Sequence, residues 1–178
     1  KLTWQERLEH LPPLEASQSL LSPADAFQRA GIQGTVTDLR LANARAGLPV
    51  YIAQIRPDTR SAPDAPRPEP RLVALDARTG ALLPPTDPAT ALASAQIYLE
   101  QGGLSPTSSS TIRPATSPRQ PSPATAQDTP GKPLYQGITV EDAHTHSKAM
   151  DLHRPLHKVL LPDAEQTLLY ISGTTGEV

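Results

Sequence analysis

The sequence predicts an α+β protein of two small lobes, each a helix packed on a short antiparallel sheet, joined by a linker rich in Pro, Ser and Thr. Two helix starts of one kind, Ser22-Pro23 and Asp87-Pro88, support this class, because Ser and Asp are good N-caps and Pro suits the first helical position. Short apolar segments between turn residues follow each start, as is typical of antiparallel strands. One Phe and one Trp among 178 residues indicate thin cores of Leu, Val, Ile and Ala.

The composition changes along the chain and sets the expected boundaries. Residues 103–133 contain seven Pro and eleven Ser or Thr, so this stretch buries too little apolar surface to offset its ordering entropy. We therefore expect a lead-in over 1–20, a first lobe over 21–85, the helix of a second lobe over 86–102, a flexible linker over 103–133 and the strands of the second lobe over 134–178.

Local patterns place the individual elements. In the lead-in, Trp4, Leu8 and Leu11 have helical spacing before Pro12-Pro13, which predicts a short helix. Gly31 and Gly102 mark the ends of the two main helices, since Gly is the favoured residue after a helix C-terminus. These helices are expected at 24–30 and 87–101, and strands at 36–41, 49–55, 138–146, 152–161 and 167–172, the last two as a hairpin. Residues 71–83 are expected to form a strand, a turn at 76–80 and a second strand.

Several functional classes lack support in the sequence. A net charge of -2 gives no electrostatic basis for nucleic acid as a partner, and zero Cys removes disulfides and thiolate chemistry. The sequence contains no G-x-S-x-G, H-E-x-x-H, G-x-G-x-x-G or P-loop pattern. No apolar run approaches the ~20 residues that span a bilayer. We therefore assign no catalytic residue to this chain.

Histidines concentrate in one short segment. Four of the five His lie there, namely His144, His146, His153 and His157. On strands, each successive pair would share a face, and such pairs can bind zinc, copper or nickel, with Glu141 or Asp142 completing the site. The alternative is that His153 is structural and the others are solvated or hydrogen-bonded.

The chain also contains an internal repeat. Residues 71–82 align without gaps on residues 167–178, and Thr79-Gly80 falls on Thr175-Gly176. Each copy is an apolar strand followed by a polar turn, in which the Gly supplies a positive φ.

These features resemble the PepSY family. Asp76-Ala77-Arg78-Thr79-Gly80 matches its D-x-x-T-G turn, and the run from His153-Arg154-Pro155-Leu156 through Leu169-Tyr170-Ile171-Ser172 to Thr175-Gly176-Glu177-Val178 resembles PepSY-associated transmembrane proteins. The opening Thr3-Trp4-Gln5-Glu6-Arg7-Leu8 and the helix start at Leu21-Ser22-Pro23-Ala24 fit the same subgroup. Gln166 departs from the pattern, which has Gly there.

The resemblance implies a location and partners. It implies two PepSY-like lobes on the periplasmic face of the bacterial inner membrane, with a juxtamembrane lead-in and membrane helices of the same parent chain before Lys1 and after Val178. Some relatives serve iron uptake, including ferric-siderophore reduction with haem held in membrane helices. No cofactor is therefore expected in this fragment itself, and haem belongs to the membrane part of the parent.

Three functional hypotheses follow from the resemblance. The first is a non-catalytic binding or regulatory domain in iron or siderophore uptake, with a ferric-siderophore or a periplasmic protein as partner. The second is the docking domain of a haem-containing membrane reductase, and the third is a peptidase-inhibitory module. Arg154 and Tyr170 are the candidate residues for contact with a ligand or partner, although the extended conformation of Arg154 before Pro155 favours packing or an ion pair for its side chain.

Overall fold

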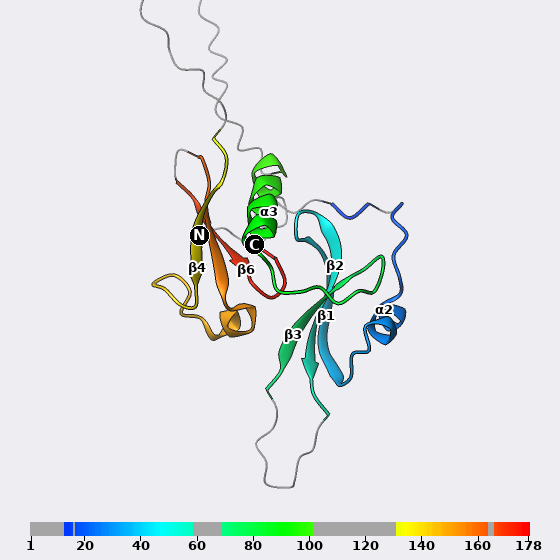
Figure 1. Cartoon of the computed structure of the whole chain (residues 1–178). Coiled ribbons are helices and arrows are strands. Elements are labelled where there is room, and N and C mark those ends of the chain that lie inside the picture. Colours follow the sequence, from blue (N-terminus) through cyan, green and yellow to red (C-terminus); the bar gives the residue numbers. More distant parts are fainter. Residues whose placement is uncertain (1–12, 16, 59–68, 102–130, 164–165) are drawn as a thin grey trace, which may run out of the picture.

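The computed structural model of the protein describes residues 13–15, 17–58, 69–101, 131–163 and 166–178. It contains two three-stranded antiparallel sheets, one in each of two small lobes, and so confirms the predicted α+β class (Figure 1). The helix predicted around Trp4 and the linker residues 103–130 lie outside the described residues. The elements are α2 (Pro23–Arg29), β1 (Thr35–Ala44), β2 (Leu48–Arg56), β3 (Arg71–Asp76), α3 (Pro88–Gln101), β4 (Leu134–Thr139), the 3-10 helix η1 (Lys148–His153), β5 (Leu156–Leu160) and β6 (Leu168–Ser172).

The first lobe packs α2 on one face of the sheet β1-β2-β3. The helix starts where the sequence predicts, because the Ser22 hydroxyl accepts a hydrogen bond from the backbone N–H of Asp25. Ala26 is fully buried against Tyr51 and Leu75 of the sheet. The predicted helix of residues 24–30 is therefore confirmed to within one residue at each end.

The opposite face of the first sheet is also buried. Val50, Ile52 and Ala74 form a second apolar cluster there, because side chains alternate between the two faces of a strand. Strand β3 contacts η1 of the second lobe, so the first sheet lies between α2 and part of the second lobe (Figure 1).

The second lobe packs α3 on the sheet β4-β5-β6. Ala91, Ala95 and Tyr98 are the buried side chains of the helix that contact the sheet, where Val159 and Ile171 are fully buried. The Asp87 carboxylate caps α3 by accepting the N–H of Thr90 at 2.7 Å. The predicted helix of residues 87–101 is thus confirmed.

Two strand predictions in the second lobe were wrong. The strand expected over 138–146 lies earlier, at 134–139. The strand expected over 152–161 starts only at Leu156, because residues 152 and 153 belong to η1. The physical reason is local: Asp142 and Thr145 bond to each other's backbone and side-chain groups, and such bonds compete with a strand ladder. The two His pairs therefore do not share strand faces as predicted.

The two copies of the internal repeat form the same backbone hydrogen bond, one in each lobe. The N–H of Gly80 donates to the carbonyl of Asp76 at 2.8 Å, and the N–H of Gly176 donates to the carbonyl of Ser172 at 2.9 Å. The two glycines have φ of 74° and 77°, a backbone conformation that residues other than Gly rarely adopt. The Thr-Gly pairs of the sequence thus build the same turn twice.

Each turn also holds the start of its helix. The residue before each N-cap donates its N–H to the second residue of the turn: Leu21 to the carbonyl of Ala77 at 2.8 Å, and Thr86 to that of Gly173 at 2.7 Å. The repeated unit is therefore larger than the alignment of residues 71–82 on 167–178 suggests, because it includes the helix start in both lobes.

Candidate functional site

Histidine 157 occupies a position that is equivalent to Tyr51 in the first lobe. Tyr51 pairs with Leu75 across the sheet and His157 with Ile171. The Tyr51 hydroxyl donates to the carbonyl of Leu21 at 2.7 Å, and Nε2 of His157 lies 2.8 Å from the carbonyl of Thr86. Both side chains from the middle strand therefore bond to the residue before the helix N-cap.

The two ring nitrogens of His157 both have protein partners. The ring is 2% exposed, and the Thr86 carbonyl can only accept, so Nε2 carries a proton. Nδ1 lies 2.8 Å from the hydroxyl of Tyr135, which donates to it when the ring is neutral. A metal ion on His157 would have to displace one of these two hydrogen bonds.

Histidine 153 belongs to a different network. It ends η1, and its Nδ1 lies 3.2 Å from the hydroxyl oxygen of Ser172. Burial lowers the pKa of His153; the Glu177 carboxylate opposes the shift and Arg40 adds to it. Burial thus disfavours the charged form of this ring at the contact between the two lobes.

The remaining two histidines are exposed and lie in the loop between β4 and η1. Nδ1 of His146 forms a 2.6 Å contact with the carboxylate of Glu141, and both side chains are more than half exposed. His144 donates its backbone N–H to Asp142. Within the described residues, no group of three or more His, Asp or Glu is arranged to hold a metal ion. The predicted metal site stays a prediction, with His146 and Glu141 as its nearest pair.

Asp142 organises a polar cluster on the face of the second sheet that lies opposite α3. Its carboxylate accepts the hydroxyl of Tyr170 at 2.8 Å and lies 3.3 Å from the ammonium of Lys158. Burial opposes its ionisation, but hydrogen bonds from His144 N–H, Tyr170, Lys158 and Thr145 outweigh it and hold the pKa of Asp142 well below its ordinary range. Burial and the Asp142 carboxylate together raise the pKa of Tyr170 to about 12.

Arg154 stabilises the loop between β4 and η1 through hydrogen bonds. Its Nη2 donates to the carbonyl of Thr145 at 2.6 Å, and its Nε donates to the carboxylate of Asp151 at 3.0 Å. Its Nη1 is buried without a hydrogen-bond partner in the described structure. Arg154 thus forms an ion pair with Asp151, and the Tyr170 hydroxyl donates to Asp142. Contact of Arg154 or Tyr170 with a ligand or partner stays a prediction.

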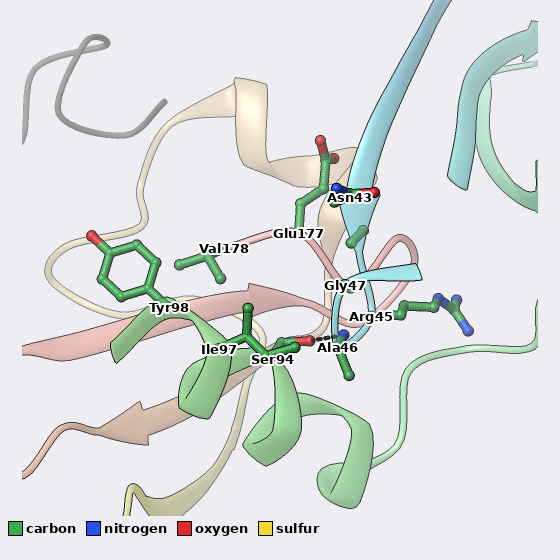
Figure 2. Close-up of a pocket in the computed structure, with 11 residues that line it drawn as sticks. Asn43, Arg45, Ala46, Gly47, Ser94, Ile97, Tyr98, Glu177 and Val178 are labelled. Atoms are coloured by element: carbon green, nitrogen blue, oxygen red, sulfur yellow. Dashed lines mark hydrogen bonds between the residues drawn. The ribbon is translucent and has the colours of Figure 1, made fainter. Parts of the chain in front are cut away.

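The lobes meet at a small cleft that the sequence did not indicate (Figure 2). Arg45, in the turn between β1 and β2, donates from Nη2 to the carbonyl of Thr174 at 2.9 Å and from Nε to that of Thr175 at 3.3 Å. The next residue, Ala46, donates its N–H to the Ser94 hydroxyl of α3 at 3.0 Å. The β1–β2 turn thereby contacts both the helix and the repeated turn of the second lobe.

This turn has an uncommon backbone conformation. Arg45 and Ala46 have φ of 44° and 61°, and each such residue other than Gly costs on the order of 1 kcal/mol. Hydrogen bonds from Arg45 to Thr174 and Thr175 and from Ala46 to Ser94 stabilise this conformation. The only sequence signal here was the turn at Ala46-Gly47, and nothing in the residue types marked Arg45 as the contact between lobes.

The size of the cleft limits what it can bind. Its volume is about 20 Å³, which is room for about one water molecule, whereas small-molecule pockets usually reach several hundred Å³. Glu177 at its rim accepts a hydrogen bond from Arg40 at 2.6 Å. The cleft residues therefore join the lobes, and the cleft itself has no room for a larger ligand. The lining residues are Asn43, Ala44, Arg45, Ala46, Gly47, Ser94, Ile97, Tyr98, Gly176, Glu177 and Val178.

Comparison of the chain with protein-family models, curated proteins and solved structures finds no significant match. Among the described residues, no helix is long and apolar enough to cross a membrane.

Proposed function

We propose that this chain is a non-catalytic binding and regulatory domain on the periplasmic face of the bacterial inner membrane, within a PepSY-associated membrane protein that serves iron or siderophore uptake. The observation that carries the proposal is the repeated unit. In both lobes a D-x-x-T-G or S-x-x-T-G turn follows the last strand and accepts the N–H of the residue before the helix, at 2.8 and 2.7 Å.

The use of the polar side chains supports a binding role rather than chemistry. His157, Tyr170 and Arg154 of the second lobe each make hydrogen bonds within the protein. These hydrogen bonds orient strands, turns and the loop before η1.

The small volume of the cleft favours a surface as the binding region. On the face opposite α3, Lys158 and Tyr170 are partly exposed and the Lys158 ammonium lies 5.9 Å from the centre of the Tyr170 ring. A cation beside an aromatic ring and a carboxylate can contact an anionic group and a planar group together. We therefore place the contact with a ferric-siderophore or a periplasmic protein on this face.

The parent protein provides the first test. We expect its absorbance spectrum in detergent, oxidised and then reduced with dithionite, to show whether the membrane part holds haem. Haem bands that reoxidise on addition of a ferric-siderophore would assign the parent as a reductase and this chain as its docking domain. An intact protein without haem would leave the binding and regulatory role, and the peptidase-inhibitory role would then be tested with periplasmic metallopeptidases.

The chain itself provides the second test. Titration of the isotopically labelled protein with a ferric-siderophore should shift amide resonances around Lys158 and Tyr170 while leaving those of α2 in place. Lys158→Ala should weaken the shifts, and Arg71→Ala, which removes an exposed cation of β3 in the first lobe, is the matched control. Unchanged resonances up to millimolar siderophore would remove the siderophore from the proposal.

A further inference from the structure

Strand β1 holds two segments that are far apart in the sequence. Near the start of the described chain, the carbonyl of Pro13 accepts a hydrogen bond from Nδ2 of Asn43 at 2.9 Å. Near its end, the carboxylate of Glu177 accepts one from Nη2 of Arg40 at 2.6 Å. Residues 40 and 43 belong to the same strand and lie about 10 Å apart along it. The segments before and after the two lobes therefore meet on one strand.

The two attachments lie at the contact between the lobes. Asn43, Glu177 and Val178 line the same cleft, as Figure 2 shows. Two residues after Asn43, Arg45 donates to two carbonyls of the turn that follows β6. Val178 packs against the apolar core of the second lobe, while the Glu177 side chain bonds to the first lobe. A displacement of either segment would therefore act on the residues that join the lobes.

The attachments are weaker than the lobes that they hold. The Arg40–Glu177 pair is exposed, with 45% of the Arg40 side chain accessible, and exposed ion pairs contribute little stability. The attachment at Asn43 is a hydrogen bond between neutral groups. The next fixed point of the chain is Leu21, which donates its N–H to the carbonyl of Ala77. Each lobe has its own apolar cluster, so under tension the attachments should open while the lobes stay folded.

We propose that β1 is a tension-sensitive clasp, which holds the two segments beside the lobe contact and releases them, loosening that contact, when they are pulled apart. The inference rests on the proposed function only for the source of the tension, which is the membrane part of the parent on either side of this chain. Relative movement of these membrane segments would reach the lobes through Asn43 and Glu177. The domain would then respond to the conformation of the membrane part.

Force spectroscopy on single molecules tests the clasp. The chain has no Cys, so handles can be attached at Leu14→Cys and at a Cys added after Val178. We expect a first step at low force that lengthens the protein by about 20 Å, as residues 14–20 become extended, before either lobe unfolds. Asn43→Leu and Arg40→Met should each lower the force of this step, and the double variant should lose it. Asp38→Asn, which changes an exposed charge on the same strand, is the matched control and should leave the step in place.

Crosslinking tests the proximity of the two segments without force. A short bifunctional maleimide should join Leu14→Cys to Val178→Cys within one chain. It should not join Leu14→Cys to Thr35→Cys, because Thr35 begins β1 and lies about 26 Å from Asn43 along the strand. Unfolding without an earlier short step, or equal crosslinking of the two pairs, would overturn the proposal. Both measurements use this chain alone, so a parent without haem or a chain that binds no siderophore would not change their outcome.

Discussion

Two glycines with positive φ, Gly176 and Gly31, differ in how closely other atoms approach them. At Gly176 an added Cβ would contact the Arg45 side chain and lie 3.3 Å from the Thr86 hydroxyl, and φ is 77°. At Gly31 φ is 62°, but nothing lies within 4 Å. The two glycines therefore separate the cost of the backbone conformation from the cost of the contact.

Gly176→Val should destabilise the protein by about 1–3 kcal/mol, because a branched side chain would adopt a strained φ and push against Arg45. Gly31→Val is the matched control and should cost less, since it carries only the backbone strain. Urea unfolding monitored by circular dichroism measures both. Equal midpoints for the two variants would show that the contact with Arg45 has no energetic weight.

His153 should make the stability of the fold depend on pH. Its pKa is lowered by burial in the native protein, whereas in the unfolded chain the imidazole gains a proton near its usual pKa of about 6.5. Because the unfolded state then binds more protons, the free energy of unfolding should fall as the pH drops from about 7 to 5. This loss should be smaller in His153→Gln and unchanged in His144→Gln, as seen in unfolding curves at each pH.

Residue-scale signals account for what the sequence predicted well. The N-caps Ser22 and Asp87, and the glycine of each Thr-Gly turn, act through their own backbone, so their effect is visible in the sequence. Gln166 shows the limit of such signals. It adopts φ of 52° at a place where the PepSY-like pattern has Gly. Its own N–H donates to the carbonyl of Asp163 and the N–H of Thr167 donates to the Asp163 carboxylate, so the turn depends on Asp163 rather than on the residue type at 166.

At the scale of elements, the second lobe shows why strand periodicity failed. A strand was predicted over 138–146 from the spacing of Val140 and Asp142, but the carboxylate of Asp142 makes a compact loop by accepting the hydroxyl of Tyr170 and the backbone N–H of His144. Tyr170 lies in a strand 28 residues later. A partner at such a distance leaves no trace in the local pattern, so the loop and η1 could not be predicted from it.

Removal of the Asp142 charge should be visible at Tyr170. Asp142→Asn should lower the pKa of Tyr170 from about 12 toward the ordinary value, because the carboxylate that opposes its ionisation is gone. The ultraviolet absorbance of the phenolate during an alkaline titration measures this. Asp151→Asn, which removes an exposed carboxylate bonded to Arg154, is the control. An unchanged tyrosine titration in Asp142→Asn would contradict the hydrogen bond.

At the scale of the whole molecule, the two lobes are joined by residues that the sequence did not single out. Two lobes of helix and sheet could be predicted because each is built from local helix and strand signals. Their contact could not, because Arg45 bonds to Thr174 and Thr175, which lie 129 and 130 residues later in the chain. The four candidate histidines lie close together in the sequence, but the structure separates them. His153 and His157 have different hydrogen-bond partners, and His144 and His146 lie in an exposed loop.

Arg45→Met should weaken the contact between the lobes. It leaves the partly buried carbonyls of Thr174 and Thr175 without these donors, so we expect a loss of about 1–3 kcal/mol of stability. Arg40→Met is the matched control: its ion pair with Glu177 is exposed and should contribute under about 1 kcal/mol. Chemical unfolding gives both values. Hydrogen exchange should show faster exchange at both lobe surfaces only in Arg45→Met, and identical exchange in the two variants would argue against this role.

The hydrogen bond between each helix start and its turn also sets an order of events during synthesis. The first lobe can close its bond from Leu21 once Ala77 has emerged, while the second cannot close its bond from Thr86 until Gly173 is present. Domains that are complete early fold while the rest of the chain is still being made. A ribosome-bound nascent chain would thus carry a folded first lobe. Its Arg45 turn would stay exposed until the turn of the second lobe forms and packs against it.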